Sequence, residues 1–136
     1  MPTSWADKQR VIEIIGDVAS DFGFGAPVLD HERSDWTEED RTFGLGGSTP
    51  ETQVVVSGGI EGPLGQWLWF TLQDLSKDTD GRFAEELAPS IEQGWEANTV
   101  TISYGANALL PEQLRDEFER RLEPFRGLTP PPPLET

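Results

Sequence analysis

The chain has 136 residues, of which 25 are acidic and 10 are basic, so its formal net charge is −15. This length is typical of one domain with one core, and 35% hydrophobic residues are enough to build that core. The sequence contains no cysteine, which excludes disulfides and thiolate metal sites and fits a reducing compartment.

No signal peptide or membrane segment is expected from the sequence. Residues 1–10 lack a basic stretch followed by an apolar run, and the longest purely apolar run spans only residues 67–70. We therefore expect a cytoplasmic protein without membrane association. The negative charge repels nucleic acid phosphates, so it argues against direct nucleic acid binding and favours a basic protein partner. Acidity that serves solubility alone is the alternative.

The first part of the chain predicts a helix that begins at Ser4 and ends near Phe22. Ser4 is placed to cap the helix, Asp7 lies near the positive end of the helix dipole, and the glycines after Phe22 favour termination. Apolar residues at helical spacing predict a buried stripe of Val11, Ile14, Ile15, Val18 and Phe22. Acidic residues spaced four apart are predicted to face solvent or a basic partner, namely Glu13, Asp17 and Asp21.

The middle of the chain predicts a series of strands. Short strands are expected near Val28 and over Thr42–Leu45, and better-defined ones over Gln53–Ser57, Gln66–Gln73 and Thr99–Tyr104. Glycines predict the turns between them, which include Gly58 and Gly59 and the hairpin residues 62–65.

Two of these strands alternate clearly in polarity. In the Gln66–Gln73 strand, the period of two predicts a core face of Leu68, Phe70 and Leu72, with Trp67, Trp69 and Thr71 on the other face. In the Thr99–Tyr104 strand, Val100, Ile102 and Tyr104 share one face, and the opposite face is polar. This pattern is typical of a sheet with one wetted side.

Two more helices are predicted towards the C-terminus. The first runs from about Gly81 to Ala97, is capped by Asp80 and kinks at Pro89, with a buried row of Phe83, Leu87, Ile91 and Trp95. The second begins at Pro111 and has Leu114, Phe118, Leu122 and Phe125 as its apolar positions. Residues 128–136 are predicted to form a proline-rich flexible tail, which leaves residues 1–127 as a single acidic domain.

This order of elements predicts a two-layer α+β domain. We expect an antiparallel sheet of about four to five strands with helices packed on one face, because the early connections are too short for crossover helices. In element order, size and acidity the chain resembles the small secretion chaperones of type III systems and, equally, toxin-immunity proteins. The resemblance implies a protein-binding role, and it assigns no particular residue.

No motif predicts catalysis, a cofactor or a metal. The segment 76–81 has the alternating carboxylates of a calcium loop, but Leu87 stands where the closing glutamate belongs, so a helix cap is the better interpretation of Asp80. His31 is the single imidazole, and its charged neighbours indicate a surface histidine. We therefore expect a non-enzymatic protein without catalytic, cofactor-binding or metal-binding residues.

The candidate partner-binding residues are two indoles and three carboxylates, namely Trp67, Trp69, Glu13, Asp17 and Asp21. Two indoles opposite the core face need cover from the chain itself, from a partner or from a second copy in a homodimer. The predicted function is binding of a basic protein partner, as an immunity protein or secretion chaperone does. The alternatives are a nucleic-acid mimic that inhibits a DNA- or RNA-binding enzyme, and a small ligand-binding domain or enzyme with an unrecognised pocket.

Overall fold

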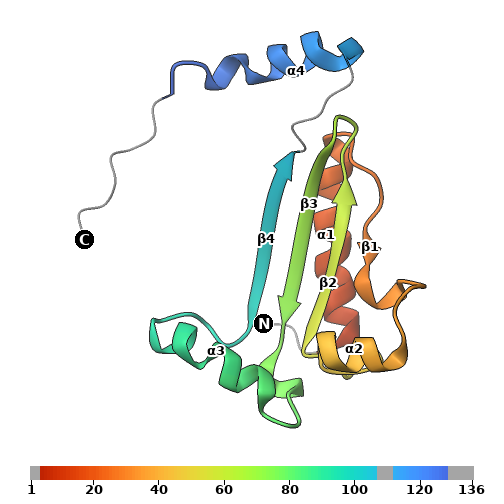
Figure 1. Ribbon diagram of the computed structural model, residues 1–136, viewed down its shortest axis with the longest axis vertical. Coiled ribbons are helices and arrows are strands. Elements are labelled where there is room, and N and C mark those ends of the chain that lie inside the picture. Colours follow the sequence, from red (N-terminus) through yellow and green to blue (C-terminus); the bar gives the residue numbers. More distant parts are fainter. Residues whose placement is uncertain (1–3, 107–111, 129–136) are drawn as a thin grey trace.

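A four-stranded antiparallel sheet with one long helix against its back forms the body of the protein (Figure 1). The computed structural model describes residues 4–106 and 112–128. The strands are β1 (Val28–Leu29), β2 (Val55–Glu61), β3 (Gln66–Gln73) and β4 (Thr99–Ala106), and they lie in the order β1-β2-β3-β4. The predicted α+β class with an antiparallel sheet is confirmed.

Four α-helices and several short 3-10 turns connect or flank the strands in the described part of the chain. The helices are α1 (Trp5–Asp21), α2 (Glu38–Leu45), α3 (Arg82–Glu92) and α4 (Arg115–Leu122). The 3-10 turns are η1 (Asp30–Glu32), η2 (Leu75–Lys77), η3 (Glu112–Leu114) and η4 (Glu123–Phe125). None of these helices has the length and apolar composition that would let it cross a membrane.

The core lies between α1 and the strands β2 and β3. Phe70 and Leu72 of β3 are fully buried, as predicted, and pack with Val56 and Ile60 of β2. On the helix, the buried members of this cluster are Ile12 and Ala19.

The face that α1 buries differs from the predicted stripe. The helix begins as expected, because the Ser4 hydroxyl accepts a hydrogen bond from the Asp7 amide. Its buried residues are Lys8, Ile12 and Ala19. Of the predicted stripe, Val11 and Ile15 are half-buried against the core, whereas Ile14, Val18 and Phe22 are exposed. The helix carries more apolar positions than the sheet can cover, and it lies close to Pro27 at Gly16, where a Cβ would be 3.1 Å from the proline ring.

The predicted strand Thr42–Leu45 is wrong, because these residues belong to α2. Thr37 and Asp40 form a capping box in which each side chain accepts from the other residue's amide. Gly46 ends the helix with φ 84°, a left-handed conformation that favours glycine. A capping box at one end and a glycine cap at the other outweigh the local strand propensity.

The turn predicted at Gly58 and Gly59 is also wrong, because both glycines lie inside β2. A Cβ at Gly58 would lie 2.6 Å from the Val28 carbonyl oxygen and 2.8 Å from the Phe70 ring, so this position requires glycine for close packing. The hairpin turn falls over residues 62–65, as predicted, and the Gly62 amide donates to the Gln66 carbonyl.

Helix α3 is shorter than the predicted helix and continues through Pro89 for only three more residues. It ends at Glu92, and Gly94 follows with φ 95°. The N-cap residue is Gly81, one residue after the predicted cap, and the Asp80 carboxylate accepts a hydrogen bond from the Arg82 amide in the first turn. Of the predicted buried row, Phe83 is buried and Leu87 is half-buried, but Ile91 and Trp95 are exposed. Trp95 lies beyond the end of the helix, and Ile91 lies in its last turn.

Strand β4 has the predicted position but is not half-buried. Val100, Ile102 and Tyr104 are 44%, 55% and 78% exposed. The reason is visible in Figure 1, where α1 runs behind β2 and β3 and β4 lies to one side of it. Helix α4 lies beyond the end of the sheet. The predicted start at Pro111 and residues 129–136 of the predicted tail lie outside the described residues.

Candidate binding surface

The sheet face opposite α1 carries both candidate tryptophans. Trp67 of β3 is paired with Glu61 on β2 and Gly105 on β4, and Trp69 is paired with Gly59 and Ser103. Paired residues share a face, so these positions form two adjacent rows across the sheet. Val28 of β1 continues the second row, because it pairs with Gly59. We call the surface made by Trp67, Trp69, Val28 and Gly59 the indole face.

Glycines shape the indole face on both sides of β3. A Cβ at Gly105 would lie 2.5 Å from the Trp67 ring, so this indole lies directly over the backbone of β4. Gly59 leaves the neighbouring space open, because the nearest atom to a Cβ built there is the Leu68 carbonyl oxygen at 3.7 Å. The result is an open depression of about 930 Å³ bordered by Val28, Trp67 and Trp69.

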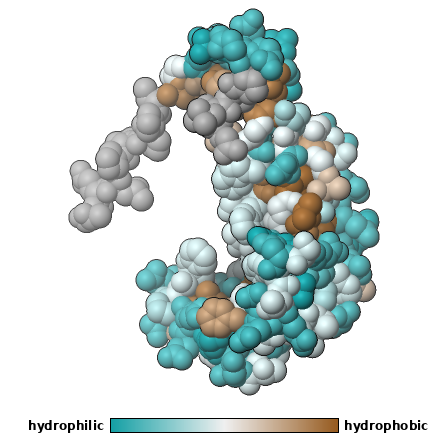
Figure 2. Space-filling model, turned by 45° about the vertical axis from the view of Figure 1, so that its right-hand side comes forward, coloured by the Kyte–Doolittle hydropathy of each residue, from teal (hydrophilic) through white to brown (hydrophobic). Residues whose placement is uncertain are grey.

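Both indoles of the indole face are accessible. Trp67 is 38% exposed and Trp69 is 49% exposed, and no helix of the described residues covers this part of the sheet (Figure 1). Most of the visible surface in Figure 2 is hydrophilic, with a small apolar patch on the body of the molecule. Two large aromatic side chains that lie together beside an open depression are typical of a contact surface.

The rim of the depression carries charged side chains. Glu61 lies beside Trp67, and Asp30 accepts a hydrogen bond from the Ser57 hydroxyl at the β1 side. Arg33 also lines the depression, but its guanidinium is paired with Asp35 through two hydrogen bonds of 3.1 Å and 2.8 Å. The paired arginine leaves Asp30 and Glu61 to give the rim a negative character.

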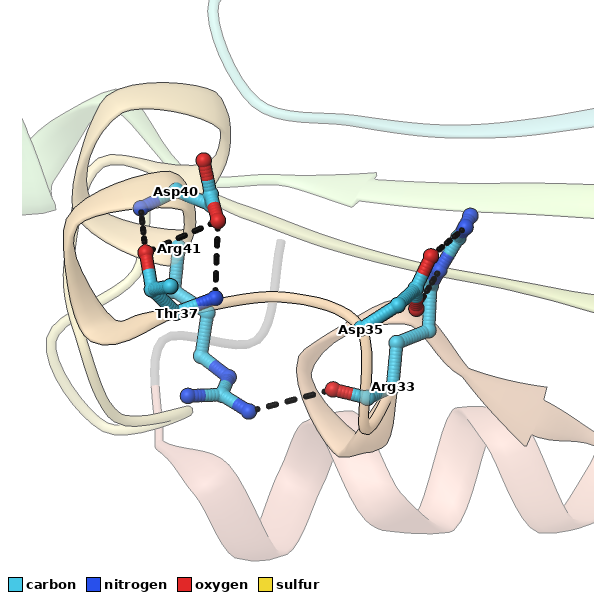
Figure 3. A network of polar contacts seen from close by, with 5 residues as sticks. All are labelled: Arg33, Asp35, Thr37, Asp40 and Arg41. Carbon is cyan, nitrogen blue, oxygen red and sulfur yellow. Dashed lines mark hydrogen bonds and ion pairs between the residues drawn. The ribbon is translucent and has the colours of Figure 1, made fainter.

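A polar network fixes the segment that presents Arg33 (Figure 3). Arg41 of α2 donates to the carbonyl oxygens of His31 and Arg33, at 2.8 Å and 3.2 Å. Hydrogen bonds from Arg33 keep the pKa of Asp35 below its usual value, so the pair stays ionised. The capping box of α2 therefore positions Arg41, which in turn holds the segment with Arg33 at the rim of the depression.

The three acidic candidates lie on a different surface. Glu13, Asp17 and Asp21 are exposed on α1, which packs on the opposite side of the sheet from the indoles. Glu13 and Asp17 border a separate depression of about 570 Å³ beside Pro27 and Glu32. The structure thus divides the predicted residues into an indole face and an acidic helix surface.

His31 is less exposed than the sequence indicates. Its ring meets the Trp5 ring edge-on at 5.7 Å, and its Nδ1 atom is buried without a hydrogen-bond partner among the described residues. Burial lowers the pKa of His31, and the nearby Glu32 only partly opposes this. The imidazole therefore favours its neutral form, and it serves as packing between α1 and η1.

A buried polar cluster lies near the start of α1. Lys8 and Asp74 are both almost fully buried, and the Lys8 ammonium donates to the Gln53 carbonyl oxygen at 3.4 Å. Burial lowers the pKa of Lys8, while the negative charge of Asp74 acts in the opposite direction. In the described residues, no group of three or more His, Asp or Glu side chains is arranged to hold a metal ion.

Several residues of the indole face and its rim escape prediction from the sequence. The sequence pattern predicts a turn at Gly59, and it gives no binding role to Val28, Glu61 or Arg33. One local signal could have corrected the prediction for β2. Gly59 and Glu61 alternate with the apolar Ile60, as expected for a strand that continues through these residues. Strand order, which places these residues beside Trp67 and Trp69, is a tertiary property.

No protein family model matches the chain, and comparisons with curated proteins and with solved structures found no significant match. The functional argument therefore rests on the geometry and chemistry of the indole face.

Proposed function

We propose that the protein is a non-enzymatic binding protein that takes a basic protein partner on the indole face. The observation that carries the proposal is the pair Trp67 and Trp69, side by side on β3 and 38% and 49% exposed. Large aromatic side chains usually supply core, but here Phe70 and Leu72 already fill the core on the other face. Two indoles left accessible in a rigid strand are suited to recognition.

The charges around the indoles favour a cationic partner. An Arg or Lys side chain can lie over an indole and pair with a neighbouring carboxylate, and Glu61 and Asp30 stand at the rim. The formal charge of −15 attracts such a partner over a longer range. Burial of each indole in a complex would contribute about 2 kcal/mol or more, as aromatic anchors do at interfaces.

A peptide selection tests this proposal and requires no assumption about the sequence of the partner. The immobilised protein is offered a random peptide library displayed on phage, and the Trp67→Ala/Trp69→Ala variant is used for counter-selection. We expect enrichment of peptides rich in Arg and Lys, with an affinity for the variant that is lower by on the order of tenfold or more.

The matched control is Phe43→Ala, which removes an exposed aromatic side chain from α2. Circular dichroism and urea unfolding establish that each variant is folded. Enriched peptides that bind the double tryptophan variant as tightly as the wild type would contradict the proposal, as would enrichment of peptides without basic residues.

A further inference from the structure

Strand β4 forms an outer edge of the sheet that is unusually open. It is eight residues long, and no strand of residues 4–106 or 112–128 pairs with its outer side. Its residues Thr99–Ala106 include no charged residue and no proline. The opposite edge is different, because β1 has only two residues and runs directly into η1.

Such an edge is a template for pairing with another strand. Monomeric proteins protect their sheet edges with lysines, prolines, bulges or very short strands, because unpaired amide and carbonyl groups attract other strands. The two-residue β1 has this protection, and β4 has none of it. The edge of β4 therefore has the properties of an interface.

The side chains around β4 also lack cover on the α1 side. Val100, Ile102 and Tyr104 pair with Leu72, Phe70 and Leu68, so they share the core face of the sheet. These three side chains are 44%, 55% and 78% exposed. An apolar row made of Val100, Ile102 and Tyr104 is therefore left open along the free edge.

We propose that β4 pairs antiparallel with β4 of a second copy, so that two four-stranded sheets join into one continuous sheet. When a strand pairs antiparallel with the same strand of a second copy, the contact is self-complementary, as a twofold-symmetric dimer requires. Two copies with a charge of −15 repel each other, and this repulsion is weakest at β4, because the strand brings no carboxylate into the contact. The uncharged edge also offers nothing to attract a basic chain, so a second β4 is the occupant that matches it.

Symmetry restricts how the two strands align. The twofold axis runs perpendicular to the sheet, so residues of one face pair with residues of the same face. The register that aligns the apolar row places Ile102 opposite Ile102 and Val100 opposite Tyr104. Both copies of α1 then lie on one side of the joined sheet, and both indole faces lie on the other. The contact is separate from the indole face and is independent of the proposed partner.

Analytical ultracentrifugation of the full chain over a dilution series tests the pairing. We expect a species of twice the 15.1 kDa chain mass. Ile102→Lys should shift this species to the single-chain mass, with a dissociation constant raised on the order of tenfold or more, because two ammonium groups then face each other across the axis. The matched control is Val28→Lys, an exposed valine on the opposite sheet edge, which should leave the doubled mass unchanged.

A cysteine cross-link tests the register and does not depend on the folding of the lysine variant. The chain has no cysteine, so Ile102→Cys introduces a single thiol. Mild oxidation should convert this variant to a covalent dimer, while Val28→Cys remains a single chain. A wild-type protein of 15.1 kDa at every concentration overturns the proposal. A doubled mass that survives Ile102→Lys, or equal cross-linking at positions 28 and 102, overturns it as well.

Discussion

Phe70 lies at the centre of the core, where its ring is fully buried between the sheet and α1. We expect Phe70→Ala to lower the free energy of unfolding by about 3–5 kcal/mol, because the truncation removes buried apolar area and leaves a cavity. Urea unfolding followed by circular dichroism measures the loss. Val28 on β1 is exposed and lies outside the proposed β4 contact, so Val28→Ala should cost less than about 1 kcal/mol. Equal losses at the two positions would contradict the assigned core.

The single histidine predicts a pH dependence of stability. The pKa of His31 is lowered from 6.5 in the folded state by burial of its ring. Between the folded-state pKa and 6.5, the unfolded chain binds more protons than the folded chain, so stability falls as the pH drops through this interval. Comparison of wild type with His31→Gln in urea should show that the variant lacks this component.

Nuclear magnetic resonance of the imidazole gives a direct measurement, since the chain has only one histidine. We expect its titration midpoint below 6.5. A midpoint at or above this value would show that the Glu32 charge outweighs burial.

At the scale of elements, the capping box of α2 links local sequence to the indole face. Thr37→Ala removes the side chain that accepts from the Asp40 amide, so we expect a loss of about 1 kcal/mol in urea unfolding. Thr79→Ala is the control, because Thr79 is a loop threonine outside any helix. If both substitutions cost the same, the box does not stabilise α2.

Strand β2 depends on a glycine whose local sequence is typical of a turn. A Cβ at Gly58 would meet both the Val28 carbonyl oxygen and the Phe70 ring, so Gly58→Ala should destabilise the protein by about 1–3 kcal/mol through overpacking. The adjacent Gly59 has open space, and Gly59→Ala should cost less. Urea unfolding of the two variants side by side tests the assigned register, and the reverse order of losses would contradict it.

At the scale of the whole molecule, charge should control the rate of association with a basic partner. We expect the association rate constant of a selected basic peptide to fall by on the order of tenfold or more as the salt concentration rises towards 0.15 M. At this ionic strength, the interaction between exposed charges is screened beyond a distance of about 8 Å. Stopped-flow fluorescence of the tryptophans measures this rate.

Charge reversal on the acidic helix surface tests the same electrostatic effect by mutation. Reversal of Glu13, Asp17 and Asp21 to lysine should slow association more than it speeds dissociation, because these residues lie on α1, away from the indole face. An association rate that is insensitive to both salt and charge reversal would mean that the acidity serves solubility alone.

Features that depend on local pattern could be predicted from the sequence alone. The start of α1 at Ser4, the two faces of β3, the hairpin at residues 62–65 and the position of β4 follow from capping, alternation and turn chemistry. The sequence also singled out Trp67 and Trp69, because their place opposite a core face is readable from the period of a strand.

Which apolar residues are buried depends on tertiary contacts and could not be predicted from periodicity. Lys8 is buried while Ile14 and Val18 of the same helix are exposed, and Ile102 is exposed although it shares a sheet face with Phe70. These outcomes depend on where α1 crosses the sheet and on β4 standing beyond it. Periodicity reports which face of an element is apolar, but burial requires a second surface, and the position of that surface is set by contacts between residues far apart in the chain.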